Sequence, residues 1–258
     1  MSAVGCPDPI PLTGAAWAAK SEAYATLVSR HLSSNSVWLD AGCGNRLLES
    51  DLDGLETWLA AHCKTIVGMD LQVSSHRNIK SLVQGSVYRL PFADNSFDLI
   101  TCRMVVEHLE DPARAFGEVS RCLRPEGTLI VITPNLRNYG IFGNAIATKL
   151  LREEWRLKLV HASDARANTD IFPVLYRANT MPRLVRLLKK SGLQIHTKLG
   201  LRQVRPYWKK SGHLEAVLMK LTPISVLMVC AHKKPCKPLA RLVPELVRSY
   251  EGSISRTA

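Results

Sequence analysis

VWLDAGCGNRL, residues 37–47, joins a short apolar run to two glycines separated by one residue. A parallel strand buried on both faces has a nearly continuous apolar run of this kind. Gly42 and Gly44 then let backbone N–H groups approach a ligand where a Cβ would collide, at the positive end of the helix expected next. The stretch therefore predicts a buried strand, a glycine turn and a helix.

The glycine turn alone leaves its ligand open, because turns of this type hold NAD, FAD, S-adenosylmethionine or no ligand. The dinucleotide fingerprint needs a third glycine three residues after the second. Position 47 is Leu, so the pattern for NAD or FAD fails here.

Size and composition favour a soluble protein that is either one large domain or one domain with an appendage. The chain has 258 residues, of which 46% are hydrophobic, so it can bury a full core. Residues 1–14 have neither the basic nor the apolar region of a signal peptide. The most apolar late segment, residues 214–230, is interrupted by Glu215, Lys220 and Pro223 and falls short of the roughly 20 clean residues of a spanning helix. We therefore expect a cytoplasmic protein without a transmembrane segment.

The seven cysteines form no CxxC pair and have no spacing that suits zinc. Free thiols in a reducing cytoplasm are the simplest interpretation. We expect no metal site from this pattern.

The net charge of +12 is divided unevenly along the chain. Residues 1–130 carry 11 Lys and Arg against 15 Asp and Glu, while residues 131–258 carry 23 against 7. From residue 177 to residue 210 there are ten basic residues and no acidic one. Such a surface attracts phosphates, anionic lipids or an acidic substrate, or it is a solvated face that only confers solubility. The sequence leaves both interpretations open.

Apolar periodicity and turn residues predict the remaining elements. Thr13 is expected to cap the first helix, Asp111 with Pro112 to begin a later one, and Thr180 to cap another. The expected helices cover residues 13–32, 47–62, 112–123 and 180–191, and the expected strands cover residues 37–40, 65–70, 81–84, 97–102, 128–133, 193–199 and 224–232.

Strand and helix alternate from residue 37 to residue 133, which predicts a parallel sheet with helices on both faces. In such sheets ligands bind outside the carboxyl ends of the strands, where the strand order reverses. Glycine and polar features lie at four of these ends, namely Asp40 to Gly44, Asp70, Gly85-Ser86 and Cys102-Arg103. Their convergence on one edge indicates a binding site.

The motif DAGCG at residues 40–44, the strand-ending Asp70, and the sequences LPF, NSFDLI and EHLEDP between residues 90 and 112 occur together. In this combination the chain resembles the class I S-adenosylmethionine-dependent methyltransferases, close to the branch with the ubiquinone and menaquinone C-methyltransferases (methyltransferase type 11). The resemblance covers residues 36–135 strongly and the rest in outline.

The resemblance implies an α/β, Rossmann-like, doubly wound and mostly parallel seven-stranded sheet with an antiparallel late strand. It further implies one methyltransferase domain over residues 1–232, with an N-terminal cap helix at 13–32 and a helical insertion at 136–178 after the fifth strand. Residues 233–258 are then a basic C-terminal tail.

The cofactor implied by the resemblance is S-adenosyl-L-methionine. The glycine turn would line its methionine end, Asp70 would accept hydrogen bonds from both ribose hydroxyls, and Leu71 would pack on the adenine. The implied cofactor-binding residues are Asp40, Gly42, Cys43, Gly44, Asp70, Leu71, Ser86, Val87, Cys102 and Arg103.

Two positions depart from the pattern of the family. Ser86 stands where the family usually has an acidic residue that reaches the adenine amino group, so the backbone of Val87 is an alternative partner. Arg46 stands where the family commonly has a third glycine, and its cation either pairs with the cofactor's carboxylate or points to solvent.

Methyl transfer from a sulfonium is an in-line displacement, so the main requirement is alignment of the reacting groups. A general base is needed only where the nucleophile must lose a proton, as a hydroxyl must. Glu107 and His108 are the candidate catalytic residues, although a packing role at a helix start is the more common reason for a histidine such as His108. Tyr139 and His161, in the insertion, are candidates for substrate contact.

Three functions agree with the sequence. The first is transfer of a methyl group to a small-molecule or glycan/lipid-linked acceptor, by O-methylation. The second is RNA methylation with the basic surface at 177–210, although Tyr207 and Trp208 are few aromatics for base stacking. The third is a cofactor-binding or scaffold protein that has lost methyl transfer, which Arg46 and Ser86 suggest. The acceptor and the oligomeric state are left open.

Overall fold

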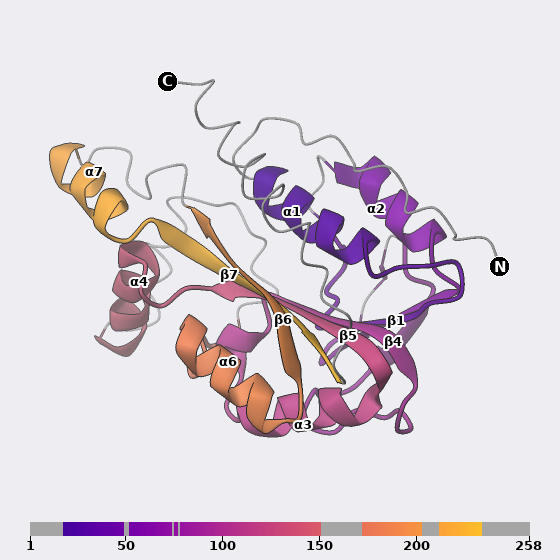
Figure 1. The fold of residues 1–258 in the computed structure, drawn as a ribbon. Helices are drawn as coiled ribbons and strands as arrows, with labels where there is room; N and C mark the ends of the chain where they lie inside the picture. Colours follow the sequence, from indigo (N-terminus) through magenta and orange to yellow (C-terminus); the bar gives the residue numbers. More distant parts are fainter. Residues whose placement is uncertain are drawn as a thin grey trace.

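The computed structural model describes one mixed sheet with helices on both faces (Figure 1). The described residues are 18–48, 52–73, 75–76, 78–150, 172–202 and 212–233. The strands are β1 (Val37–Ala41), β2 (Thr65–Asp70), β3 (Ser81–Gln84), β4 (Phe97–Arg103), β5 (Leu123–Pro134), β6 (Gln194–Arg202) and β7 (Ile224–His232).

The seven strands have the order β3-β2-β1-β4-β5-β7-β6. β1 to β5 pair in parallel, while β7 is antiparallel to both β5 and β6. The order reverses between β1 and β4, which is where open sheets of this kind bind ligands. The Rossmann-like α/β fold, with a mostly parallel seven-stranded sheet and an antiparallel late strand, is confirmed.

The helices form layers on the two faces of the sheet (Figure 1). α1 (Ala18–Ser29) and α2 (Asp53–Ala61) cover one face, and α3 (Pro112–Cys122) and α6 (Met181–Lys190) cover the other. The short helix η2 (Val106–His108) follows β4, and α4 (Tyr139–Leu150) follows β5. α7 (Gly212–Leu221), which was not expected from the sequence, precedes β7. None of the helices in the described ranges is long and apolar enough to cross a bilayer.

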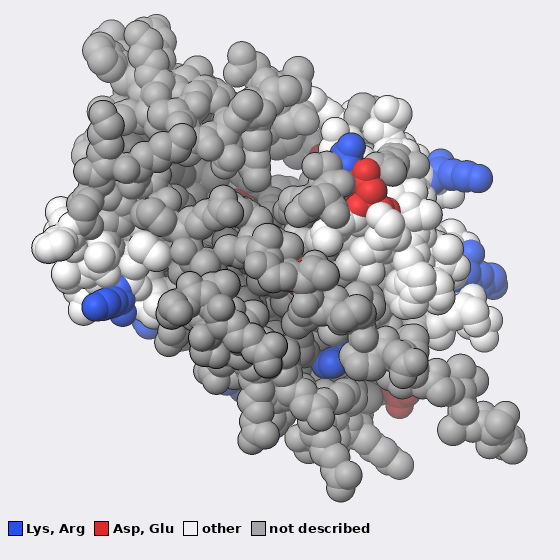
Figure 2. Space-filling model, turned by 90° about the horizontal axis from the view of Figure 1, so that it is seen from above, with Lys and Arg blue, Asp and Glu red and all other residues white. Residues whose placement is uncertain are grey.

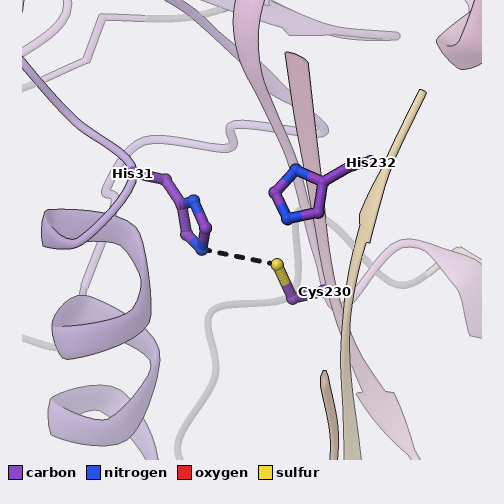
Figure 3. Close-up of side chains that lie close together, drawn as sticks. All are labelled: His31, Cys230 and His232. Atoms are coloured by element: carbon purple, nitrogen blue, oxygen red, sulfur yellow. Dashed lines mark hydrogen bonds between the residues drawn. The ribbon is translucent and has the colours of Figure 1, made fainter. Parts of the chain in front are cut away.

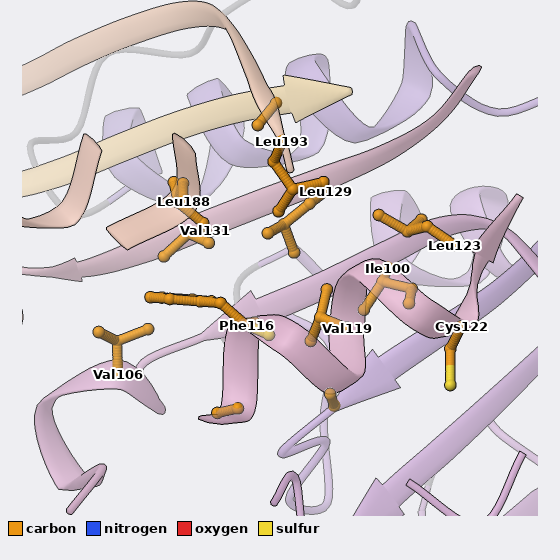
Figure 4. Close-up of a cluster of buried hydrophobic side chains, with 14 of the residues drawn as sticks. Ile100, Val106, Phe116, Val119, Cys122, Leu123, Leu129, Val131, Leu188 and Leu193 are labelled. Atoms are coloured by element: carbon orange, nitrogen blue, oxygen red, sulfur yellow. The ribbon is translucent and has the colours of Figure 1, made fainter. Parts of the chain in front are cut away.

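Each face of the sheet has its own hydrophobic core, because successive residues of a strand point to opposite faces. Leu99 belongs to the core beneath α1 and α2, and the next residue, Ile100, belongs to the core beneath α3 and α6. Figure 4 shows the second core, in which Phe116 and Val119 of α3 pack against the sheet. Both layers therefore hold the parallel strands in one register.

The beginning of α3 agrees with its sequence signal. Pro112 is the first helical residue, and the carboxylate of Asp111 accepts the backbone N–H of Arg114 at 3.1 Å. The apolar spacing of Ala113, Phe116, Val119 and Leu123 in the sequence predicts that all four lie on one buried stripe, but Ala113 is exposed. The buried stripe is centred on Ala115 and Val119, and residue 113 lies on the other side of the helix at 100° per residue.

Two elements begin elsewhere than the sequence suggests. α2 begins at Asp53 rather than near residue 47, because the N–H of Leu48 is held in a loop by the buried carboxylate of Glu56 at 3.0 Å. β5 begins at Leu123, five residues before the strand expected at residues 128–133, so Gly127 lies within the strand and does not precede it. A register shift against β4 and the left-handed backbone of Glu126 (φ 67°) let this strand continue through an irregularity.

Candidate cofactor-binding site

The glycine turn after β1 is attached to the end of β2. The carbonyl oxygen of Met69 accepts the N–H groups of Gly42 at 2.7 Å and Cys43 at 3.1 Å. Gly42 has φ +81° and Gly44 has φ +53°, which are conformations that favour glycine. A Cβ on Gly42 would overlap the side chain of Val105, whereas a Cβ on Gly44 would meet no atom of the described residues within 4 Å. The turn is therefore packed against Val105 at Gly42, and it has an open side at Gly44.

Asp70, the last residue of β2, faces this open side. One carboxylate oxygen accepts the N–H of Gly44 at 2.9 Å, and the other accepts the N–H of Leu71 at 2.7 Å. A carboxylate has about four lone-pair positions, so both oxygens keep capacity for a further donor. The side chain of Leu71 is 50% exposed and offers an apolar surface next to these acceptors.

A buried polar group lies beneath the turn. Asp40 is 2% exposed, and its carboxylate accepts the hydroxyl of Thr101 at 2.6 Å. The indole N–H of Trp38 donates to the same threonine oxygen at 2.8 Å. Burial raises the pKa of Asp40 to about 6, although the Thr101 hydrogen bond and the charge of Arg103 oppose the shift. The carboxylate thus lies in an environment that favours a nearby cation.

Tyr24 of α1 belongs to this buried group and was not singled out as a site residue from the sequence. Its side chain is 1% exposed, and burial, together with the nearby charge of Asp40, raises its pKa. α1 thus contributes a residue to the floor of the site. An isolated tyrosine in an alanine-rich helix gives no signal of this placement.

Arg46 pairs with Asp53, whereas the sequence predicts that its cation either pairs with the cofactor's carboxylate or points to solvent. Its guanidinium lies 2.9 Å from the carboxylate of Asp53 at the beginning of α2. Arg103, at the end of β4, donates to the backbone carbonyl of Arg46 at 3.2 Å. These contacts join the glycine turn to α2 and to β4.

The remaining expected cofactor contacts surround the same edge. The hydroxyl of Ser86 accepts the N–H of Tyr88 at 3.3 Å, and Val87 is half-buried against the core. Cys43 and Cys102 are buried, and burial raises the pKa of each thiol to about 12, so both are neutral at physiological pH.

Two residues after β4 were not anticipated. Met104 has a left-handed backbone (φ 56°), and its N–H donates to Ile132 at 2.8 Å. Val105 contacts Gly42, as described above. Strained residues of this kind occur at functional sites, and no local sequence pattern identifies them in advance.

Glu107 and His108 occupy η2, just after Val105. Glu107 is 3% exposed, and its carboxylate accepts the hydroxyl of Thr133 at 3.0 Å. Nδ1 of His108 lies 3.1 Å from the carbonyl oxygen of Pro173, and burial lowers the pKa of this histidine. A histidine whose Nδ1–H donates to a carbonyl carries its free lone pair on Nε2.

The two candidates for substrate contact differ in what the structure describes. Tyr139 begins α4, and its backbone N–H donates to the hydroxyl of Thr222 at 3.0 Å, which joins α4 to the segment after α7. His161 lies outside the described residues.

Known proteins resemble this chain in sequence and fold. Residues 39–131 match the family model of the methyltransferase domain. A demethylmenaquinone methyltransferase of Corynebacterium kroppenstedtii is 27% identical over 154 residues, which are 60% of this chain and 65% of that protein. Geranyl diphosphate C-methyltransferase of Streptomyces coelicolor A3(2), solved with S-adenosyl-L-homocysteine, has a TM-score of 0.53 at 15% identity, covering 82% of this chain and 77% of that chain. The [4+2]-cyclase SpnF has a TM-score of 0.52 at 15% identity, covering 85% and 82%.

These comparisons confirm the resemblance to class I S-adenosylmethionine-dependent methyltransferases for the domain and its fold. The chain spans between 31% and 65% of the length of the curated relatives that it matches first. At 15% identity the two solved structures are evidence for the fold alone, and one of them is a cyclase. A shared fold does not determine a reaction, so the activity depends on the site.

The two glycines of the turn should differ in their tolerance of alanine. Gly44→Ala is expected to lower the free energy of unfolding by about 1 kcal/mol, because only the left-handed backbone is penalised. Gly42→Ala adds the overlap with Val105 and should cost about 3 kcal/mol in all. Urea denaturation measures both, and Gly42→Ala combined with Val105→Ala should recover part of the loss. Equal effects of the two single changes would contradict the described packing.

Asp40 should make the folded state less stable as the pH rises. Its folded pKa of about 6 lies above the usual value of an unfolded aspartate, so its protonated form favours folding. This contribution is present below about pH 4 and is lost as the pH rises through 6, to a limit of about 3 kcal/mol. The unfolding free energies of the wild-type protein and Asp40→Asn, measured from pH 4 to pH 8, should therefore diverge. Parallel curves would rule out a raised pKa.

Proposed function

We propose that this protein, whose residues 39–131 match the family model of the methyltransferase domain, transfers a methyl group from S-adenosylmethionine to an acceptor molecule. The observation that supports the proposal most is the position of Asp70. Its carboxylate stands at the carboxyl end of β2, with acceptor capacity left, beside Gly44 in the turn that follows β1, and β1 is one of the two strands between which the order reverses.

The residues of this edge fit the cofactor. Asp70 would accept the two ribose hydroxyls, and the exposed side chain of Leu71 would pack on the adenine. The turn at residues 42–44 would leave room for the methionine end, and the buried carboxylate of Asp40 would favour the cationic groups there. Arg46 is not needed for this, because its charge is paired with Asp53. Ser86, Val87, Cys102 and Arg103 would complete the site.

When bound, the cofactor supplies an electrophilic methyl group on a sulfonium. The chain then needs to hold the acceptor in line with that methyl group. We expect this alignment to be the chain's largest contribution to the rate of transfer. Two parts of the fold would position the acceptor. One is Met104 after β4, which has a left-handed backbone and is 37% exposed, and the other is the segment after β5.

We further propose that the acceptor is a small molecule or a glycan- or lipid-linked group, and that the reaction is O-methylation with His108 as the base. Supporting this, a ring whose Nδ1–H donates to the carbonyl oxygen of Pro173 carries on Nε2 the lone pair that would take a proton, and the pKa of His108, lowered by burial, keeps the ring neutral. Glu107 has its carboxylate bound to Thr133 and would position η2. Tyr139 and the helical segment after β5 would shape the acceptor pocket.

The described part of the basic segment 177–210 gives little support for an RNA acceptor. On α6 the basic residues 183, 186, 189 and 190 are exposed, while Leu184 and Leu188 face the core, as in any amphipathic surface helix. On the face in Figure 2, the described Lys and Arg side chains are scattered singly and do not form a continuous patch. Tyr207 and Trp208 lie outside the described residues.

Cofactor binding can be measured before an acceptor is known. S-adenosylmethionine at about 100 times its dissociation constant should stabilise the protein by about 2.7 kcal/mol, and NAD should not. Asp70→Ala should abolish this shift, whereas Asp94→Asn, on an exposed loop, should keep it. Differential scanning fluorimetry reads both changes. A shift that survives in Asp70→Ala would contradict the proposed site, and binding without methyl transfer to any component of a cell extract would favour the scaffold function.

The role of His108 predicts a pH dependence. In the wild-type protein the turnover rate should fall as the pH drops through the pKa of His108, which lies below the ordinary value of 6.5. His108→Asn should lower the rate by roughly 10²–10⁴-fold and remove this acid limb. The control is His62→Gln, an exposed histidine that stacks on Trp58. The assay measures transfer of a labelled methyl group to the acceptor found by mass spectrometry, and an unchanged pH profile in His108→Asn would exclude the base.

A further inference from the structure

A second cluster of reactive side chains lies at the opposite edge of the sheet. β7 is antiparallel to β5, so its last residue, His232, pairs with Thr128 near the beginning of β5. Cys230 and His232 are two apart on β7 and therefore face the same side, toward His31 at the end of α1. Figure 3 shows the three side chains His31, Cys230 and His232 pointing toward one another.

The distances within this cluster suit a metal ion. One ligand atom from each of the three residues lies within 4.8 Å of the others. Nε2 of His31 is 3.5 Å from the sulfur of Cys230. A tetrahedral zinc ion with ordinary Zn–N and Zn–S bonds separates such atoms by about 3.5 Å. The pair is thus already spaced as two ligands of one ion.

The other nitrogens of the two rings share one acceptor. The hydroxyl oxygen of Thr128 lies 3.3 Å from Nδ1 of His31 and 2.9 Å from Nδ1 of His232. A hydroxyl oxygen has two lone pairs and can accept from both N–H groups. This arrangement leaves both Nε2 atoms as lone-pair donors, which is the arrangement of metal-bound histidines.

His232 also provides a polar atom that the described residues leave unsatisfied. Its Nε2 is buried and forms no hydrogen bond within the described part of the chain, and the residue is 3% exposed. His196 packs edge-on against His232 at 5.1 Å between ring centroids and supports its orientation.

We propose that His31, Cys230 and His232 bind one zinc ion, with water in the fourth position. Two imidazoles and one thiolate are a donor set that suits zinc. On binding, the thiol of Cys230 loses its proton to solvent and the sulfur bonds to the ion, so one proton is released per zinc. The ion would tie the end of α1 to β7 at the edge remote from the glycine turn, and this site does not depend on the proposed methyl transfer.

No sequence pattern indicates this site, because His31 is almost 200 residues from the other two ligands, Cys230 and His232. The expectation of no metal rested on the spacing of the cysteines alone. The antiparallel insertion of β7 is what brings residues 230 and 232 to the end of α1.

Cobalt(II) is a spectroscopic probe of this proposal in the untagged, full-length protein. One equivalent should produce the thiolate-to-cobalt charge-transfer band of a tetrahedral site, and zinc should displace it. Cys230→Ser should lose the band, and Thr128→Val should weaken binding by roughly 10–100-fold through loss of the shared acceptor. Cys63→Ser, which removes a half-buried thiol beyond α2, should leave the spectrum unchanged. Cobalt binding without a band, or a band that survives in Cys230→Ser, would overturn the proposal.

A second measurement uses the wild-type cysteine and histidines, so it does not depend on the folding of a ligand variant. Cys230 is buried and reacts with an alkylating reagent only when the structure opens locally, so zinc should slow its alkylation in a time course on the wild-type protein, as read by mass spectrometry of the peptide that contains it. It should not protect Cys63. Equal labelling of Cys230 with and without zinc would exclude the site, and protection that persists in Asp70→Ala would separate it from the cofactor edge.

Discussion

The carbonyl oxygen of Met69 accepts two backbone N–H groups from the glycine turn, and the carboxyl edge of the sheet depends on this junction. It fixes the turn against β2, which in turn places Gly44 against the carboxylate of Asp70. The contact of Val105 with Gly42 adds β4 to the same assembly. Three strand ends are thus joined, and the junction of the glycine turn with β2 at Met69 consists of backbone groups alone, so it does not depend on side-chain rotamers.

The sequence predicts those parts of the fold whose signals are local. β2, β3 and β7 have the bounds expected from their apolar runs, and Asp111 caps α3 as its pairing with proline indicates. Local signals fail where a distant residue decides the outcome. α2 begins late because Glu56 holds the preceding loop, and Arg46 finds its partner in Asp53, a residue that spacing alone does not single out.

The same distinction applies to the candidate site. Asp70 and the two glycines are recognisable from their positions after apolar runs, because strand ends meet at one edge of a parallel sheet. Tyr24 and Met104 are not recognisable in this way, and neither is the cluster of His31, Cys230 and His232 around Thr128. Their environment arises from the packing of α1 on the sheet and from the antiparallel entry of β7, and both are properties of the assembled fold.

The buried carboxylate of Asp40 has a further consequence for proton exchange with solvent. With a pKa of about 6 it is partly protonated near neutrality, and a cation bound beside it would favour the ionised form. By linkage, binding of a cationic ligand would then expel a fraction of a proton, and its affinity would rise with pH until Asp40 is fully ionised. A ligand of the same shape without the positive charge would release less. The heat of binding would accordingly vary with the ionisation enthalpy of the buffer for the charged ligand more than for the neutral one.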